Sequence, residues 1–229
     1  MQSNWEITKM TAKQKFIEEK DDLKNSRMNR ILHAAFVLFS ENGIDTIAMT
    51  DIAKKAEIGV ASLYRYYETK DEIAIQTAIW AWQEQKNYLM PELTNNNFDR
   101  LEGIAQLKKI FELFISLYEK QGDFLRFIYF FDSYAVRQKI QQTRLTLYQS
   151  MIESVEETVE KAITKGISDK SINSKFIGQE KVLYFTLMHA LFSTSQKLTL
   201  SGNMLKMDSE VFGKKELEVL SDLLINSLK

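Results

Sequence analysis

Apolar residues recur every three or four positions along most of the chain, which is the spacing of one face of an α-helix. This periodicity predicts helices over 27–41, 52–56, 60–67, 70–89, 104–118, 124–134, 145–162, 173–200 and 209–228. A single proline and eight glycines among 229 residues leave room for few tight turns. The sequence therefore predicts an all-α protein.

Two of these helices form a helix-turn-helix. Ile52 and Ala56 share one face of the first helix, and the apolar run stops at 57–59, a turn short enough to impose a sharp angle between two helices. On the second helix Leu63 and Tyr67 are four residues apart, so both can close over the first helix. The opposite side of the second helix is then free to lie in a DNA groove.

That free side predicts the DNA contacts. Val60 and Ala61 are small and apolar and can approach thymine methyl groups, while the Tyr64 phenol can reach a base edge or a phosphate. Tyr66 and Lys70 flank this side as predicted phosphate contacts. The full set of predicted DNA-binding residues is Thr50, Gly59, Val60, Ala61, Ser62, Tyr64, Arg65, Tyr66 and Lys70.

This region resembles the DNA-binding region of the tetracycline-repressor (TetR) family of transcriptional regulators. The matching segments are AAFVLFSENGID (34–45), DIAKKA (51–56) and LYRYYETKDEI (63–73), in the family's order and spacing. The resemblance implies an N-terminal three-helix helix-turn-helix domain and a larger C-terminal helical domain for effector binding and dimerisation. It also implies a ligand-responsive regulator, most often a repressor, that binds a palindromic double-stranded DNA operator as a homodimer and is released by a small-molecule effector.

Three positions depart from the family's pattern. Ala48 stands where the family usually has a capping threonine, so the reciprocal cap with Asp51 is expected to be missing, at a cost of roughly 0.5–2 kcal/mol. Glu57 occupies a turn position that is often glycine, and Gly59 replaces the usual serine cap of the recognition helix. These changes leave the motif intact and affect only which backbone amides hold phosphate.

The chain divides into three predicted regions. Residues 1–25 form an arm, helical or mobile, whose lysines either follow the DNA backbone or belong to an untethered leader. Residues 26–72 form the helix-turn-helix domain, and 73–229 form the effector-binding and dimerisation domain with its linking helix. The linking helix is expected to begin near Lys70 and to end at about Leu89, before Pro91, with a loop at 95–97.

The second half of the chain contains the residues expected of an effector pocket, because aromatic rings give an apolar ligand its shape and Tyr or His groups give a polar handle. The candidates are Phe111, Phe114, Tyr118, Phe127, Phe131, Tyr148, Met151, Met188 and His189. The simpler alternative for each is an ordinary core position. Arg126 is the one cation in the aromatic segment 124–134: facing inward it would favour an anionic effector, and facing outward it is a surface residue.

The last two predicted helices are apolar over a wider arc than one domain needs. In the resembling family these helices pair across a two-fold axis, so the excess predicts a homodimer interface. The predicted interface residues are Leu183, Leu187, Leu217, Leu220 and Leu224, with Val219 and Leu223 beside them.

Composition excludes several classes of site. Cysteine is absent, the two histidines are far apart, and no two glycines lie close enough for a phosphate-binding loop, so no cofactor, metal site or catalytic residue is predicted. The net charge of −1 gives no basic patch. Because the sequence has neither a signal peptide nor a membrane-spanning run, a soluble, cytoplasmic protein with no membrane partner is expected. The glutamates at 153–160 are interpreted as a solvated face.

Two other classes of function remain as alternatives. One is a protein-interaction module whose helix-turn-helix is purely structural. The other is a small-molecule enzyme built on a helical bundle, for which the sequence offers no paired nucleophile and base. The leading prediction is a regulator and not an enzyme.

Overall fold

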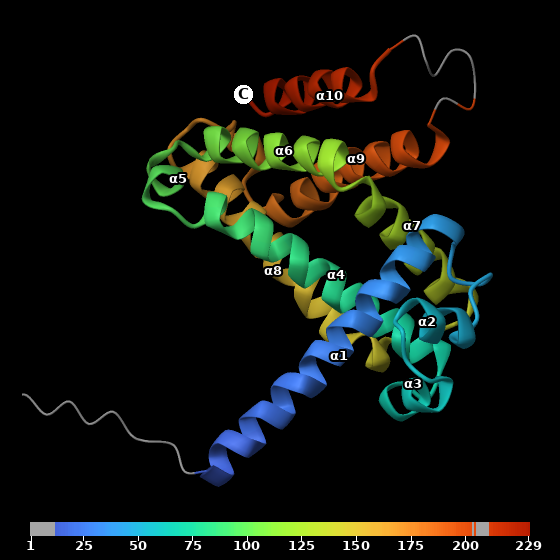
Figure 1. Ribbon diagram of the computed structural model, residues 1–229. Helices are drawn as coiled ribbons and strands as arrows, with labels where there is room; N and C mark the ends of the chain where they lie inside the picture. The colour runs from blue at the N-terminus through green and yellow to red at the C-terminus, as the bar shows by residue number, and fades with distance from the viewer. Residues whose placement is uncertain (1–11, 203, 205–210) are drawn as a thin grey trace, which may run out of the picture.

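A computed structural model describes residues 12–202, 204 and 211–229, and these residues form helices, turns and loops with no strand among them (Figure 1). The helices are α1 (Ala12–Asn42), α2 (Met49–Lys55), α3 (Val60–Tyr66), α4 (Lys70–Leu93), α5 (Asn96–Arg100), α6 (Gly103–Lys120), α7 (Gly122–Arg137), η1 (Gln142–Arg144), α8 (Thr146–Ser168), η2 (Ser174–Phe176), α9 (Glu180–Ser201) and α10 (Gly213–Ser227). The predicted all-α class is confirmed. No helix of the described residues is long and apolar enough to cross a membrane.

Two hydrophobic cores organise these helices. The first core joins α1, α2, α3, the first half of α4, α7 and the start of α8. The second core joins the end of α4 with α5, α6, α8, α9 and α10. Figure 1 shows the consequence: α2 and α3 lie at one end of the molecule, α10 lies at the other, and α4 and α7 run between them. The first core does not stop at residue 72, because Ile73, Ala78 and Trp82 of α4 belong to it.

Helix α1 begins well before residue 27, where the sequence pattern places its start. Its packed stripe starts at Ile31, while the described residues between 15 and 30 are exposed apart from a half-buried Met28. This first half projects from the fold in Figure 1. Much of the predicted arm is therefore a continuation of α1, and residues 1–11 lie outside the described part of the chain. The exposed turns contain many strong helix formers such as Lys and Glu.

Helix α4 begins at Lys70 as expected but does not stop before Pro91. It continues to Leu93, because a proline in the last turn removes only one hydrogen bond and side chains supply others. The Thr94 hydroxyl donates to the Met90 carbonyl at 2.8 Å, and the Asn95 amide donates to the Pro91 carbonyl at 3.0 Å. The Asn95 side chain also caps the short helix α5, so the loop predicted at 95–97 is confined to Thr94 and Asn95, and Asn96 and Asn97 are helical.

The start of α9 is the other boundary that the sequence pattern misplaces. The predicted helix from 173 is broken: η2 is a single turn, and Gly178 has a positive φ of 78° before α9 begins at Glu180. Ile177, expected on the apolar stripe of that helix, is exposed. By contrast the predicted boundary between the helices at 104–118 and 124–134 is confirmed, since Gln121 separates α6 from α7.

Helices α6 and α8 cross at a pair of glycines. A Cβ added to Gly103 would collide with the backbone of Gly166 and with the Ala162 carbonyl. The start of α6 is held there by two hydrogen bonds, from the Gly103 amide to Asp169 at 2.8 Å and from the Ile104 amide to Ser171 at 3.1 Å. This close approach fixes the C-terminal half of the fold around α8.

Candidate nucleic-acid interface and internal cavity

The start of α2 retains half of the capping pair that the sequence predicts to be absent. Ala48 has no side-chain acceptor, but its backbone amide donates to Asp51 Oδ2 at 2.9 Å. The Asp51 carboxylate therefore satisfies one orphan amide of the helix start and places a negative charge at the positive end of the helix dipole. The prediction of a missing cap with Asp51 is wrong for this half of the pair.

The turn between α2 and α3 depends on a strained residue. Glu57 has a φ of 54°, in the left-handed region that glycine adopts most easily. The Ile58 amide closes the turn by donating to the Ala53 carbonyl at 3.0 Å. Helix α3 then starts after Gly59, which offers no side-chain cap. The short turn that the sequence predicts between the two helices is therefore present.

Helix α3 presents one side to the core and the other to solvent. Leu63 and Tyr67 are buried in the first core with Ile52 and Ala56, as predicted. Val60 is 38% exposed and Tyr64 is 48% exposed, and Ala61 and Arg65 are exposed beside them. We call Val60, Ala61, Tyr64 and Arg65 the outer face of α3. Of the other predicted DNA contacts, Thr50 and Gly59 are exposed, whereas Ser62, Tyr66 and Lys70 are half-buried.

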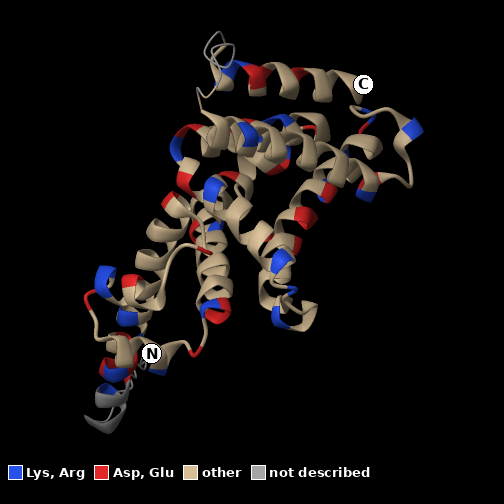
Figure 2. Ribbon diagram, turned by 90° about the vertical axis from the view of Figure 1, so that its right-hand side faces the viewer, with Lys and Arg blue, Asp and Glu red and all other residues tan. Residues whose placement is uncertain are grey.

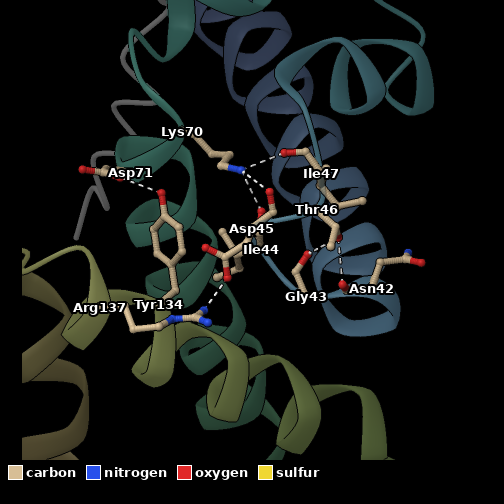
Figure 3. Close-up of polar contacts among 10 residues, drawn as sticks. All are labelled: Asn42, Gly43, Ile44, Asp45, Thr46, Ile47, Lys70, Asp71, Tyr134 and Arg137. Atoms are coloured by element: carbon tan, nitrogen blue, oxygen red, sulfur yellow. Dashed lines mark hydrogen bonds and ion pairs between the residues drawn. The ribbon is translucent and has the colours of Figure 1, made fainter.

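Lys70 does not point at solvent, contrary to the phosphate contact predicted for it. Its ammonium group donates to the carbonyls of Ile44, Asp45 and Ile47 at 2.9, 3.0 and 3.0 Å (Figure 3). An ammonium group has three N–H donors, so this set uses all of them. Lys70 therefore anchors the loop between α1 and α2 to the start of α4.

The charge around this end of the molecule is mixed. Arg27, Arg30, Lys54 and Lys55 are exposed in the helix-turn-helix region, and so are the acids at 51, 57 and 68. Figure 2 shows basic and acidic residues interspersed along the ribbon instead of gathered on one surface. Any DNA contact must therefore use individual cations, such as Arg65, and not a continuous basic patch.

A polar cluster joins the helix-turn-helix to α7. The Tyr134 hydroxyl donates to Asp71 at 2.7 Å, and Arg137 forms an ion pair with Asp45 (Figure 3). Arg144 contacts the other oxygen of Asp71 at 3.2 Å. Burial, followed by the hydrogen bond to Asp71, raises the pKa of Tyr134. Sequence reasoning missed this cluster because its bonded pairs are 63 to 92 positions apart.

A cavity of about 210 Å³ lies between the two cores. Its lining residues are Trp82, Phe114, Ile128, Asp132, Tyr148, Ile152, Val155, Tyr184, Phe185, Met188, His189 and Phe192. Trp82, Ile128 and Tyr148 belong to the first core, whereas Phe114, Tyr184 and Met188 belong to the second. The hollow is thus placed where a bound molecule would contact both halves of the protein.

The cavity contains some of the predicted effector residues and not others. Phe114, Tyr148, Met188 and His189 line it. Phe111, Phe127 and Phe131 are fully buried in the cores, so the simpler core alternative holds for them. Tyr118 and Met151 are not among the lining residues either. Helical spacing identified apolar positions correctly but could not separate core from cavity wall.

Asp132 is the one acid among the several cavity residues that sequence reasoning missed. The Tyr148 hydroxyl donates to Asp132 Oδ1 at 3.0 Å. Desolvation by the surrounding protein raises the pKa of Asp132 to about 6, against the lowering effect of that hydrogen bond, although the side chain remains solvent-accessible. Burial and the charge of Asp132 raise the pKa of Tyr148 well above its ordinary value. The available signal was a lone acid inside the aromatic run 124–134.

Other charged residues of this half form ion pairs, but Glu156 and Glu160 are half-buried, so the face predicted to be solvated at 153–160 is only partly so. Arg126 forms an ion pair with Asp123 one turn away and is not a cavity residue, so its outward alternative holds. Glu156 pairs with Lys181 at 3.0 Å and Glu157 pairs with Lys161 at 2.7 Å. Within the described residues, no group of three or more His, Cys, Asp or Glu side chains could hold a metal ion.

Three of the five predicted dimer-interface residues are buried within the protomer. Leu183 and Leu187 lie in the second core, and Leu217 is fully buried. They cannot face a partner, because their own fold covers them. Leu220 and Leu224 are half-buried against the second core. The exposed apolar residues of α9 and α10 are instead Val182, Phe185, Val219 and Leu223.

Residues 31–77, which include α2, α3 and the outer face, match the family described as "Bacterial regulatory proteins, tetR family". The helix-turn-helix region therefore belongs to the TetR family. The negative transcriptional regulator IcaR of the biofilm operon icaADBC in Staphylococcus epidermidis is 28% identical over 132 residues, which are 55% of this chain and 67% of that protein. For IcaR of Staphylococcus aureus the identity is 29%, over 40% of this chain and 48% of that protein. The chain thus spans about half to two thirds of these TetR-family relatives.

Solved structures share the fold over most of the chain. A TetR-like transcriptional regulator from Rhodococcus sp. RHA1 superposes with a TM-score of 0.61 at 21% identity, covering 88% of this chain and 95% of that one. FadR from Bacillus subtilis, solved in complex with stearoyl-CoA, has a TM-score of 0.64 at 15% identity, covering 87% of this chain and 98% of that one. At these identities the likeness shows the TetR-family fold. Membership of this family indicates a regulator and not an enzyme.

Proposed function

We propose that this protein is a transcriptional repressor that binds an operator in double-stranded DNA through α3. The outer face of α3 carries the proposal, because Leu63 and Tyr67 anchor the helix while Val60, Ala61 and Tyr64 point to solvent. Small apolar side chains there favour thymine methyl contacts, so we expect T/A-rich contacted steps. The description of IcaR as a negative regulator supports repression.

A matched pair of exposed tyrosines tests the DNA contact. Tyr64 is 48% exposed on α3 and Tyr129 is 45% exposed on α7, so each can be changed to alanine without disturbing a core. On a duplex selected from random DNA, Tyr64→Ala is expected to lose about tenfold in affinity and Tyr129→Ala to bind as the wild type does. Val60→Glu should bind even less, since it adds an anion to the face. Unchanged affinity in both α3 variants would remove this face from the account.

The repressor is proposed to act as a homodimer on a palindromic operator. Two recognition helices related by a two-fold axis would meet successive major grooves, about 34–36 Å apart or a multiple of that distance. Val182 and Phe185 of α9 and Val219 and Leu223 of α10 support the assembly, because they leave apolar surface exposed on neighbouring helices. The exposed residues of this surface, and not the buried leucines, would form the contact.

Leu223→Glu tests the interface against a matched control. Leu223 is 64% exposed on α10 and Leu147 is 59% exposed at the start of α8. A glutamate at 223 is expected to give a helical monomer without operator binding, because a charge would be buried in the contact. Leu147→Glu should remain a dimer, and Leu220→Glu should damage the fold itself. Light scattering that finds a monomeric wild type, or a dimeric Leu223→Glu variant, would contradict the interface.

A small molecule in the cavity is proposed to release the DNA. The neighbour FadR, crystallised with stearoyl-CoA, supports ligand binding in this fold. Helix α7 offers the mechanical link, because Ile128 and Asp132 line the cavity while Tyr134 and Arg137 hold the helix-turn-helix. A ligand that shifts α7 would change those contacts and the position of α3. On this proposal residues 26–72 read DNA and 73–229 bind effector and partner.

A further inference from the structure

The wall of the cavity is aromatic and has one acid. Trp82, Phe114, Tyr148, Tyr184, Phe185 and Phe192 present rings to it. Among the described residues that line the cavity there is no lysine or arginine, and the ionisable groups besides the tyrosines are Asp132 and His189. Aromatic faces carry negative potential, which attracts cations. The carboxylate and the aromatic rings therefore both favour a positively charged ligand.

Asp132 has no cation of its own. Its only hydrogen bond from the described residues comes from Tyr148, at 3.0 Å to Oδ1, and it takes part in none of their ion pairs. Oδ2 is therefore left without a protein donor in that part of the chain. The side chain is exposed at the edge of the cavity, and with a pKa raised to about 6 the carboxyl group is mostly ionised at neutral pH. An ionised, unpaired carboxylate on a cavity wall gains most from a cationic partner.

We propose that the cavity binds an organic cation, a protonated amine or quaternary ammonium group attached to a small apolar or aromatic body, with its charge beside Asp132. This proposal rests on the proposed function in one respect, which is that the cavity is the effector site. Tyr148 of α8 and Tyr184 of α9 line the same cavity as Asp132, so a cation bound there can meet aromatic rings and a carboxylate together. An anionic ligand would meet the Asp132 charge with no compensating cation in the wall.

The cavity also limits the size of the ligand. Its volume of about 210 Å³ is below the roughly 300–1,000 Å³ of pockets for drug-sized molecules. A smaller apolar space of about 30 Å³ shares Trp82, Phe114 and Val155 with it, so a short apolar group can extend past the indole. A single ring or a short branched chain fits this space. Phe185 is half-exposed and His189 is exposed, so the cavity reaches solvent beside α9.

Calorimetric titration with a pair of probes of opposite charge tests the proposal. Benzyltrimethylammonium combines one ring with a fixed positive charge, and phenylacetate combines the same ring with a negative charge. We expect the full-length protein to bind the first at least about tenfold more tightly at neutral pH. Equal affinity for the two probes, or tighter binding of phenylacetate, would overturn the proposal.

Variants on α7 locate the charge. Asp132→Asn keeps the shape and the acceptor for Tyr148 but removes the charge, and should weaken benzyltrimethylammonium binding about tenfold or more while leaving phenylacetate binding no weaker. Asp132→Glu keeps the charge and should retain most of the affinity. Asp123→Asn is the matched control, because Asp123 is an exposed acid on the same helix paired with Arg126. If Asp132→Asn binds the cation as the wild type does, the site is not at Asp132.

A separate measurement of DNA binding distinguishes this inference from the proposed function. Wild type and Asp132→Asn are titrated with the selected duplex in the absence of probe, and both should bind it, because Asp132 is not part of the outer face of α3. Retained DNA binding without preference for the cation would overturn the ligand inference alone. Loss of DNA binding by the wild type, with cation binding intact, would overturn the proposed function and leave the cation site standing.

Discussion

The helix-turn-helix end and the cavity end of this molecule differ in how completely their interiors are filled. At the first, Lys70 satisfies three backbone carbonyls and Leu63 and Tyr67 close a dense core. At the second, two cores meet around an open space of about 210 Å³. Of the buried side-chain polar atoms without a partner among the described residues, Tyr67 Oη lies at the first end, and Trp82 Nε1, Gln85 Oε1 and Glu160 Oε1 lie beyond it.

This difference corresponds to two tasks. A surface that reads DNA must hold its shape before the duplex arrives, since bidentate and methyl contacts tolerate little displacement. A site that senses a ligand must instead leave space and unmet polar groups for the ligand to fill. Helix α7 belongs to both ends, so a change at the cavity has a direct path to Asp45 and Asp71.

The largest predicted effect tests how tightly the C-terminal half is fixed around its helix crossing. Gly103→Ala should destabilise the protein by about 3 kcal/mol or more, because the added Cβ meets the backbone of Gly166 instead of a movable side chain. Gly59→Ala is the control, since nothing lies within 4 Å of its added Cβ, and it should cost less than about 1 kcal/mol. Urea unfolding of both variants measures the difference, and similar midpoints would contradict the close crossing.

A second prediction tests whether the helix-turn-helix end is held by Lys70. Lys70→Met keeps the length of the side chain but loses three charge-assisted hydrogen bonds to the loop at 44–47, so it should cost about 2 kcal/mol of unfolding free energy. Lys55→Met, at an exposed position, should leave stability nearly unchanged. Had Lys70 held a phosphate, its loss would instead lower the salt slope of DNA binding by about 1 with little effect on stability.

The smallest predicted effect tests the unpaired charge of Asp132 in the cavity. The pKa of Asp132 is raised from 3.8 to about 6, so the folded state holds this proton more tightly than the unfolded chain does. Its ionisation therefore costs stability as the pH rises from about 4 to about 6, and the cost persists at neutral pH. Asp132→Asn should then stabilise the protein by about 1 kcal/mol at neutral pH, after allowance for screening by solvent.

That gain should disappear as the pH falls below about 4, where Asp132 is protonated in both states. Tyr148 on α8 and Tyr184 and His189 on α9 line the same cavity and are present in both proteins. Thermal unfolding of wild type and variant across this pH range gives the difference. A gain that is independent of pH would show that packing, and not charge, separates the two proteins.

The helix-turn-helix was predictable because its signals are local. A turn at 57–59, the four-residue spacing of Leu63 and Tyr67 and an acid-rich helix start after Thr69 each lie within a few positions, and each is present in the structure. Lys70 was assigned wrongly for the opposite reason. Its three acceptors lie 23 to 26 residues away, and nothing in the local pattern distinguishes an anchoring lysine from a phosphate contact.

The cavity was predictable only as a region. The helical period of the second half marks Phe111, Phe114, Phe127 and Tyr148 equally as apolar, and which of them lines a void depends on how α4, α7, α8 and α9 pack together. The buried leucines Leu183 and Leu217 were assigned to a partner surface for the same reason. An apolar arc wider than one domain needs indicates that a helix has two apolar surfaces. It does not indicate which residues lie on each surface.

The claim on which the account depends most is that the exposed side of α3 reads DNA in paired half-sites. Selection of random duplex DNA by the wild-type protein tests it most directly, with Val60→Glu selected in parallel. The account predicts enrichment of an inverted repeat, T/A-rich at the contacted steps, whose half-sites are separated by one helical turn or a multiple of it, and no such enrichment by Val60→Glu. A wild-type pool indistinguishable from the input, or the same repeat enriched by Val60→Glu, would contradict it.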